Sequence, residues 1–264
     1  MGKALGHGLS LNANYTFSKT LDLNGSPDIF NRDLGKDLAA NDLPHQFRLS
    51  AEYTTPKLKN GIFQNKIMSY VFSDWGMGWF LQYQSAVALA RPTNNTTTPI
   101  SQFLGRGPGS AQLIAGKPLY STDWTDLDGK HHTDELDINC HCYDPTKTLV
   151  LNKDAWENIP NGVFGAQQSQ IRGFRGVRQP LENVNFSRNF RIKERMSFQI
   201  RAEFTNAFNR SRWGTTQSAP VNVGNFQSVP SIANGIYTGG FGTILPASGT
   251  PNFRTGILIA RLVF

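Results

Sequence analysis

Six segments of the chain alternate between apolar and polar residues. In the clearest of them, 195–205, the apolar positions are Met196, Phe198, Ile200, Ala202 and Phe204, with polar side chains between them. An alternation of period 2 predicts a β-strand with one apolar and one polar face. The six predicted strands lie near residues 8–18, 44–54, 76–85, 181–190, 195–205 and 254–264.

The length of these segments indicates strands that cross a membrane. A tilted transmembrane strand needs ~9–11 residues, whereas strands of globular proteins average ~5–6. The polar faces carry charged residues such as Arg48 and Glu203, and aromatic residues gather toward the ends of the apolar faces. Aromatic girdles around a lipid-facing band, with a hydrated interior, are typical of outer-membrane barrels. A soluble antiparallel β-sandwich, in which alternation is equally expected, is the alternative.

The connections fit alternating sides of a membrane. Barrels of this kind have short periplasmic turns and long extracellular loops. The longer links, 19–43, 86–180 and 206–253, fall outside the cell in this assignment, and 55–75 and 191–194 fall in the periplasm. Within 55–75, apolar residues recur at helical spacing, which predicts a short helix that lies at the membrane interface or simply packs against the protein.

Six strands are too few for a closed barrel, because single-chain bacterial barrels begin at eight and open edges are not tolerated in lipid. Residues 1–15 also lack the apolar block of a signal peptide, although an outer-membrane protein must be exported. We therefore expect the chain to be the C-terminal part of a larger barrel, or one part of an oligomeric barrel.

The composition agrees with an all-β protein that has one wet face. Hydrophobic residues make up 39% of the chain, charged residues 17% and aromatic residues 11%, with 25 glycines. A disordered chain would lack the aromatics, and a helical bundle would be rich in Ala, Leu, Glu and Lys. The net charge of +7 comes from scattered rather than striped basic residues, so we expect no nucleic-acid partner.

Five stretches, in order along the chain, resemble barrel segments of TonB-dependent outer-membrane transporters, in particular the Oar-like branch abundant in Acidobacteria. Residues 195–209 read RMSFQIRAEFTNAFN and are similar to the penultimate-strand signature of that family. The other four are DLPHQFRLS at 42–50, GWFLQYQS at 78–85, GFRG at 173–176 leading to NFS at 185–187, and GFGTI at 240–244.

The resemblance implies that residues 1–264 are the last part of a barrel of about 22 strands with a plugged lumen. The family's plug domain and TonB-contacting segment have no counterpart here. It further implies TonB-energised uptake of a nutrient in the outer membrane, with outer-membrane lipid, lipopolysaccharide and the barrel-assembly machinery as partners. The terminal Phe264 resembles the aromatic residue that this machinery reads. We expect no catalytic residue and no cofactor; a barrel that only displays loops for adhesion is the rival function.

Four charged residues on the polar faces are candidates for contact with a plug. They are Arg48, Glu52, Arg201 and Glu203, and alternation directs all four to the same interior. They either pair with each other and keep the interior wet, or form part of a surface on which the plug docks. We favour docking over direct contact with a substrate.

The long loop 86–180 holds the remaining chemistry. Its weak metal-ligand candidates are His131, His132, Cys140, His141 and Cys142. Cys-x-Cys is not the spacing of structural zinc, so we expect a solvated loop in which the two cysteines are either oxidised, as thiols outside the cell tend to be, or idle. A basic run, 170–178, with Arg172, Arg175 and Arg178, is expected near lipopolysaccharide phosphate or at the loop mouth.

Overall fold

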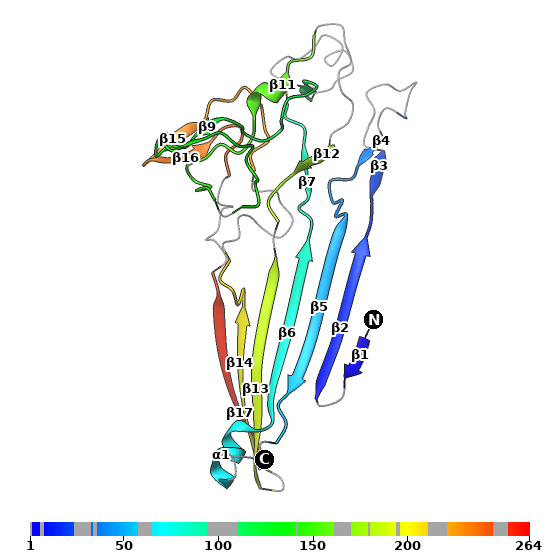
Figure 1. The fold of residues 1–264 in the computed structure, drawn as a ribbon, viewed down its shortest axis with the longest axis vertical. Helices are drawn as coiled ribbons and strands as arrows, with labels where there is room; N and C mark the ends of the chain where they lie inside the picture. The colour runs from blue at the N-terminus through cyan, green and yellow to red at the C-terminus, as the bar shows by residue number, and fades with distance from the viewer. Residues whose placement is uncertain are drawn as a thin grey trace.

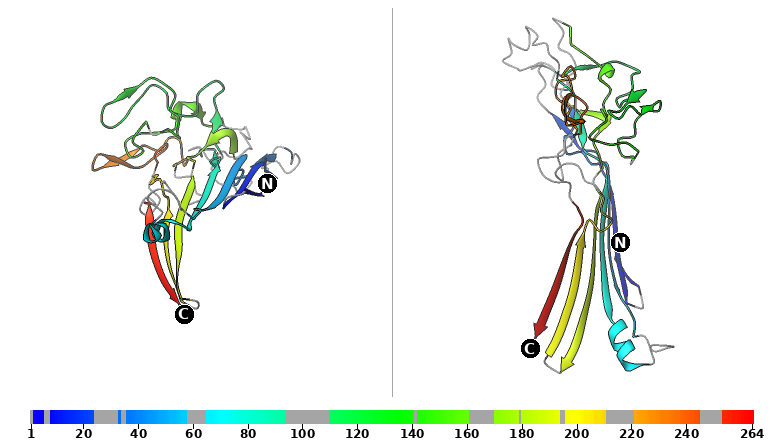
Figure 2. Two further views of the ribbon diagram at one scale, coloured as in Figure 1. Left: turned by 60° about the horizontal axis from the view of Figure 1, so that its bottom comes forward. Right: turned by 90° about the vertical axis from the view of Figure 1, so that its left-hand side faces the viewer.

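The computed structural model describes residues 2–5, 8–23, 33, 36–57, 65–93, 110–140, 142–160, 170–178, 180–193, 196–210, 221–244 and 253–264. Long antiparallel strands form one sheet, and most of the shorter elements gather above one end of it (Figure 1). Further views show that the sheet is curved rather than flat (Figure 2). This all-β architecture confirms the predicted fold class.

Each of the six predicted strands is present at its expected place. They are β2 (Leu9–Phe17), β5 (His45–Thr54), β6 (Trp75–Gln84), β13 (Leu181–Lys193), β14 (Met196–Thr205) and β17 (Thr255–Val263). A seventh, short strand that the pattern did not predict, β1 (Gly2–Leu5), pairs with β2. The sheet order is β1-β2-β5-β6-β13-β14-β17, so β1 and β17 are its edges and the sheet is not closed.

The strand register puts the polar positions of the sheet on one common face. Arg201 lies opposite Ser187 on β13 and Ile259 on β17. Farther along, Ser187 lies opposite Gly76, and Gly76 opposite Thr54 on β5. Directly paired residues in a sheet point to the same side, and the resulting face, called the inner face below, is polar from β2 to β14.

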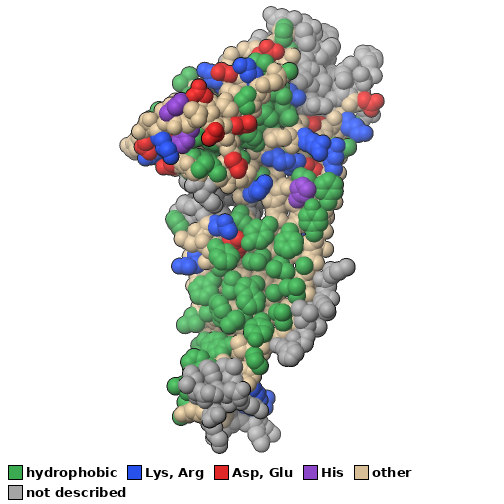
Figure 3. All heavy atoms as spheres, viewed as in Figure 1, with side chains coloured by type: hydrophobic (Ala, Val, Ile, Leu, Met, Phe, Trp, Pro, Cys, Tyr) green, Lys and Arg blue, Asp and Glu red, His purple; other side chains and the backbone are tan. Residues whose placement is uncertain are grey.

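The opposite, outer face is an apolar band. Hydrophobic side chains cover the strands between the upper elements and the lower end of the sheet (Figure 3). Tyr15 and Phe17 are 60% and 69% exposed at the upper end, and Trp75 and Phe190 lie toward the lower end. Within the described part of the chain no second sheet packs on this band. The β-sandwich alternative is therefore wrong, because a sandwich would bury these side chains between two sheets.

The link between β5 and β6 contains the expected helix, α1 (Lys66–Phe72). The Asn65 side chain caps its N-terminus by accepting a hydrogen bond from the Ile67 amide at 2.9 Å. Tyr70 Oη donates to the carbonyl of Arg191 at 3.0 Å, and Trp75 Nε1 donates to the carbonyl of Val71 at 3.0 Å. These contacts hold α1 against the lower end of the sheet. No helix among the described residues has the length and hydropathy needed to cross a membrane.

A charged residue, Arg188, lies on the outer face beneath α1. It is only 4% exposed, and its guanidinium donates to the carbonyl of Tyr70. The guanidinium carbon lies 4.6 Å from the ring centroid of Phe190 and 5.9 Å from that of Trp75. Cation–π contacts and the helix cover thus shield the charge where lipid would otherwise meet it.

The short elements above the sheet, together with the loops that connect them, form a folded unit that is called the cap here. The elements at this end are β3 (Leu21–Leu23), β4 (Lys36–Leu38), β7 (Ala88–Ala90), β8 (Gln112–Leu113), β9 (Trp124–Thr125), β10 (His131–His132), η3 (Lys153–Ala155), β11 (Trp156–Glu157), β12 (Gln170–Arg175), β15 (Ser231–Ala233) and β16 (Ile236–Gly239). The cap has a hydrophobic core that includes Val150, Trp156, Phe174, Phe241 and Ile244. The expected solvated loop is therefore wrong for the described part of 86–180 that supplies this core, although the stretch around His131 is exposed.

Two loops that are far apart in the sequence interlock in the cap. The Val150 amide donates to the Gly242 carbonyl at 2.7 Å, and the Tyr237 amide donates to the Thr146 carbonyl at 2.8 Å. Gly242 has φ +78°, and a Cβ there would lie 3.1 Å from the backbone nitrogen of Leu151. Glycine is therefore required where the stretch 240–244 crosses the first loop.

Candidate functional site

The four inner-face charges share one surface but do not form one cluster. Arg201 Nε lies 2.6 Å from Glu203 Oε1, and both side chains are partly exposed. Arg48 Nη2 donates to Gln46 Oε1 at 3.4 Å, and Glu52 lies opposite Ser10. Strands β6 and β13 separate β5 from β14. An exposed ion pair contributes only ~0–1 kcal/mol to stability. Arg201 and Glu203 can therefore separate and bind other partners at little cost.

An ion pair at the upper rim of the sheet connects two stretches that carry the family resemblance. Arg175 Nη2 lies 2.6 Å from Asp42 Oδ2, and the Asp42 side chain is 2% exposed. Arg175 Nη1 donates to the carbonyls of Asp42 and Ala86 at 3.0 and 2.9 Å. Asp42 Oδ1 also accepts from the Thr20 amide at 2.7 Å. Arg175 therefore holds β12 against the sheet. Its expected position near lipopolysaccharide phosphate or at the loop mouth is wrong, because its guanidinium is engaged in these structural contacts.

Tyr120 completes the attachment of β12. Its hydroxyl donates to the Arg175 carbonyl at 2.7 Å and lies 2.9 Å from the Arg175 amide, from which it accepts. Burial raises the pKa of Tyr120 above its ordinary value of 10.0, partly opposed by the Arg175 backbone hydrogen bond and charge. The hydroxyl therefore stays protonated at neutral pH and remains able to donate.

A second ion pair lies at the upper end of the outer face. The Glu182 side chain is 0% exposed and accepts from Arg210 Nε through both carboxylate oxygens, at 3.0 and 2.9 Å. Tyr83 Oη donates to the same carboxylate at 2.8 Å. Sequence reasoning missed this pair, although an acidic residue at an apolar-face position of 181–190 was a signal for it. The pairing satisfies a buried charge beside the apolar band.

The His and Cys residues of the long loop do not assemble into a metal centre within the described residues. Cys140 and Cys142 form a disulfide, which confirms the oxidised of the two expected states and removes both thiolates as ligands. His131 Nε2 lies 3.1 Å from Asp123 Oδ1, and the His132 ring stacks on Trp124 with centroids 3.8 Å apart. His141 lies outside the described residues.

Phe264 lies just after β17, at the lower end of the sheet, and is 91% exposed. This is the periplasmic end in the assignment above, because the long links and the cap lie at the other end. Its role as an assembly signal stays a prediction.

One curved sheet of bilayer-length strands, with a charged polar inner face and an apolar outer face, defines the wall of a transmembrane β-barrel. Residues 1–255 match the family model described as an outer membrane beta barrel domain, and the chain belongs to this family. The protein is therefore a protein of the bacterial outer membrane. Neither the curated proteins nor the solved structures yielded a match to the chain.

Proposed function

We propose that the chain forms the C-terminal wall and surface loops of a TonB-dependent receptor that takes up a nutrient across the outer membrane. The observation that carries this proposal is the polar inner face, with Arg201 and Glu203 joined only by an exposed ion pair. Among the described residues no further strand pairs with the edges β1 and β17, and edges in lipid need partner strands. A wider barrel of about 22 strands would pair both edges and leave room for a plug.

The resemblance of the five sequence stretches supports the same proposal. In this view the plug and the TonB-contacting segment belong to the rest of the receptor, which meets the inner face of this wall. The barrel-assembly machinery would read Phe264, and no residue of the chain would act as a catalyst.

A comparison of nutrient depletion tests the proposal for any substrate in the medium. The parent strain, a strain that lacks the gene for the full-length protein, and a strain without functional TonB are grown on the same complex medium. We expect at least one compound to remain in the medium of both mutant strains while the parent removes it. If the gene deletion leaves the depletion of every compound unchanged, the proposal is wrong.

The inner-face charges give a separate prediction about the plug. In the full-length receptor, the double variant Arg201→Ala, Glu203→Ala is expected to release the plug at a lower concentration of denaturant than the wild type. Barrel assembly, measured as heat-modifiable mobility on gels, should not change, because the exposed pair contributes only ~0–1 kcal/mol to the wall. Failure of assembly would show that the two residues are structural.

Loop display for adhesion is the second candidate function, and the cap favours it. The buried core and the interlocked loops make the cap a folded unit that could present a fixed surface. Under this alternative, the gene deletion would reduce attachment of cells to a surface while leaving all nutrient depletion intact. The depletion experiment thus separates the two functions.

A further inference from the structure

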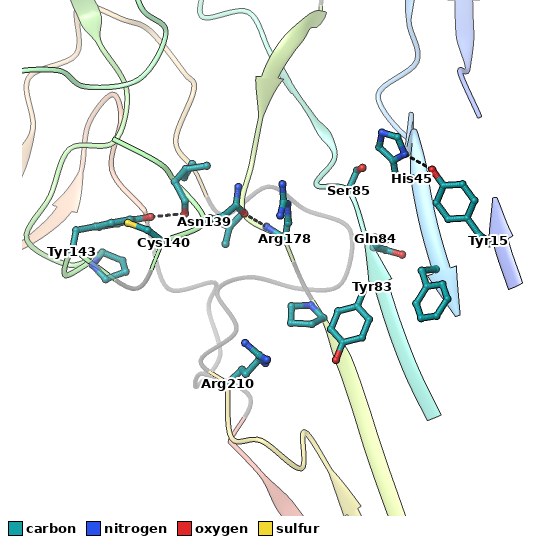
Figure 4. Close-up of a pocket in the computed structure, with 15 residues that line it drawn as sticks. Tyr15, His45, Tyr83, Gln84, Ser85, Asn139, Cys140, Tyr143, Arg178 and Arg210 are labelled. Carbon is teal, nitrogen blue, oxygen red and sulfur yellow. Dashed lines mark hydrogen bonds between the residues drawn. The ribbon is translucent and has the colours of Figure 1, made fainter. Parts of the chain in front are cut away.

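A hollow of about 700 Å³ lies between the outer face of the sheet and the cap. Its floor is made by side chains at the upper ends of β2, β5 and β6, namely Tyr15, His45, Phe47 and Tyr83. Figure 4 shows Tyr15, His45 and Tyr83 on one side, the cap residues Asn139, Cys140 and Tyr143 on the other, and Arg178 between them. The hollow therefore lies outside the barrel wall, away from the lumen.

The aromatic residues that line the hollow indicate how deep in the membrane it lies. Tyr15 and Tyr83 belong to the upper aromatic end of the apolar band, and Tyr15 is 60% exposed. Aromatic girdles of barrels lie at the level of the lipid headgroups. The hollow thus opens where the headgroups of the outer leaflet meet the acyl chains below.

The chemistry of the lining is amphipathic, with a cation at its upper side. Phe47, Ile138 and Val177 supply apolar surface, and Asn139 and Ser85 supply polar groups. Arg178 is exposed, and within the described residues its guanidinium has no carboxylate partner. Arg210, by contrast, is bound to Glu182. The cap side also carries an acid, Asp137, whose Oδ1 accepts from the Asn139 amide at 2.9 Å.

The cap side of the hollow is held in place without help from a ligand. The Cys140–Cys142 disulfide closes the turn, and Tyr143 Oη donates to the Ile138 carbonyl at 2.9 Å. Asn139 Oδ1 accepts from the Arg178 amide at 2.8 Å, which ties the basic residue to this turn. Burial of Tyr143, with a smaller contribution from Asp137, raises the pKa of Tyr143 strongly, so its hydroxyl remains a donor.

We propose that this hollow binds the phosphorylated headgroup of an outer-leaflet lipid. The phosphate lies against Arg178, where a guanidinium can donate two hydrogen bonds to it, and the acyl chains follow Phe47 and the band below. The proposal depends on the membrane placement of the wall and is independent of nutrient uptake.

The full-length protein is purified in detergent and incubated with purified lipid A. Native mass spectrometry then measures how many lipid A molecules are bound to each protein. Arg178→Glu is expected to lower the bound lipid A about tenfold, the range of one lost charge-assisted contact. Arg178→Lys should bind less lipid A than the wild type and more than Arg178→Glu, since the positive charge remains but the paired hydrogen bonds of the guanidinium are lost. Lys117→Glu is the charge-matched control on an exposed part of the cap away from the hollow, and it should bind like the wild type.

Three further probes identify what is bound. Dephosphorylated lipid A should bind to the wild type as weakly as lipid A binds to Arg178→Glu. Phosphatidylglycerol that binds equally well, with the same loss in the variant, would support a phospholipid as the source of the phosphate. Displacement of lipid A by inorganic phosphate at equal concentration would overturn the proposal, because the acyl chains would then contribute nothing. Equal binding by wild type and Arg178→Glu, with both barrels heat-modifiable, would also overturn it.

Discussion

At the scale of single residues, the ion pairs differ in how far they are buried. Arg201 and Glu203 pair in the open on the inner face, whereas Arg175–Asp42 and Arg210–Glu182 pair where one partner is almost fully buried. The sequence placed Arg201 and Glu203 on the correct face because alternation alone decides it. It could not predict the Arg175–Asp42 pair, because that contact depends on how the cap folds back onto the rim.

Loss of the buried Arg175–Asp42 pair is predicted to destabilise the protein far more than loss of the exposed Arg201–Glu203 pair. Asp42→Ala leaves the guanidinium of Arg175 without its partner, and removal of one member of a buried pair costs about 3–5 kcal/mol. Hydrogen exchange measured by mass spectrometry should show faster exchange in β12 and in the segment around Asp42. The control, Arg201→Ala, should leave exchange in β12 unchanged; equal effects of the two substitutions would contradict this account.

At the scale of elements, the long strands were predictable and the cap was not. Alternation is a local property, and the six strands follow from it because each has one face toward lipid and one toward water. The short strand β1 is too brief to show the pattern, and the cap elements are mostly two to four residues long. Their order comes from a core shared between two distant loops, with backbone hydrogen bonds such as Val150 to Gly242. Such contacts leave no period in the sequence.

The helix α1 was predicted as either interfacial or merely packed, and its exposed residues favour the interface. Ile67 is 72% exposed, and Met68 and Phe72 are 45% and 51% exposed, beside the lower end of the apolar band. Ile67→Cys, labelled with an environment-sensitive fluorophore, should show blue-shifted emission after the full-length protein is reconstituted into lipid vesicles. A label at Lys117→Cys on the cap should report water. Water-like emission from both sites would show that α1 stays outside the lipid.

At the scale of the whole molecule, the structure is a wall with a different chemistry on each side. The outer face offers hydrocarbon to lipid, and the cap stands above the rim (Figure 3). The inner face offers polar groups to water, as the strand register shows. Family membership agrees with this division. The sequence predicted both faces and the membrane, because the period and length of the strands encode them, whereas the hollow beneath the cap arises only from tertiary packing.

The accessibility of single cysteines along β14 tests most directly whether one face of the wall meets lipid and the other meets water. Single cysteines replace each residue from Phe198 to Glu203 in the full-length protein, which is then treated in native outer membranes with a water-soluble maleimide. The account predicts labelling at 199, 201 and 203, and little labelling at 198, 200 and 202, because alternate side chains face the lumen and lipid. Uniform labelling along the strand, or labelling in the opposite phase, would contradict a membrane wall with its charged face inward.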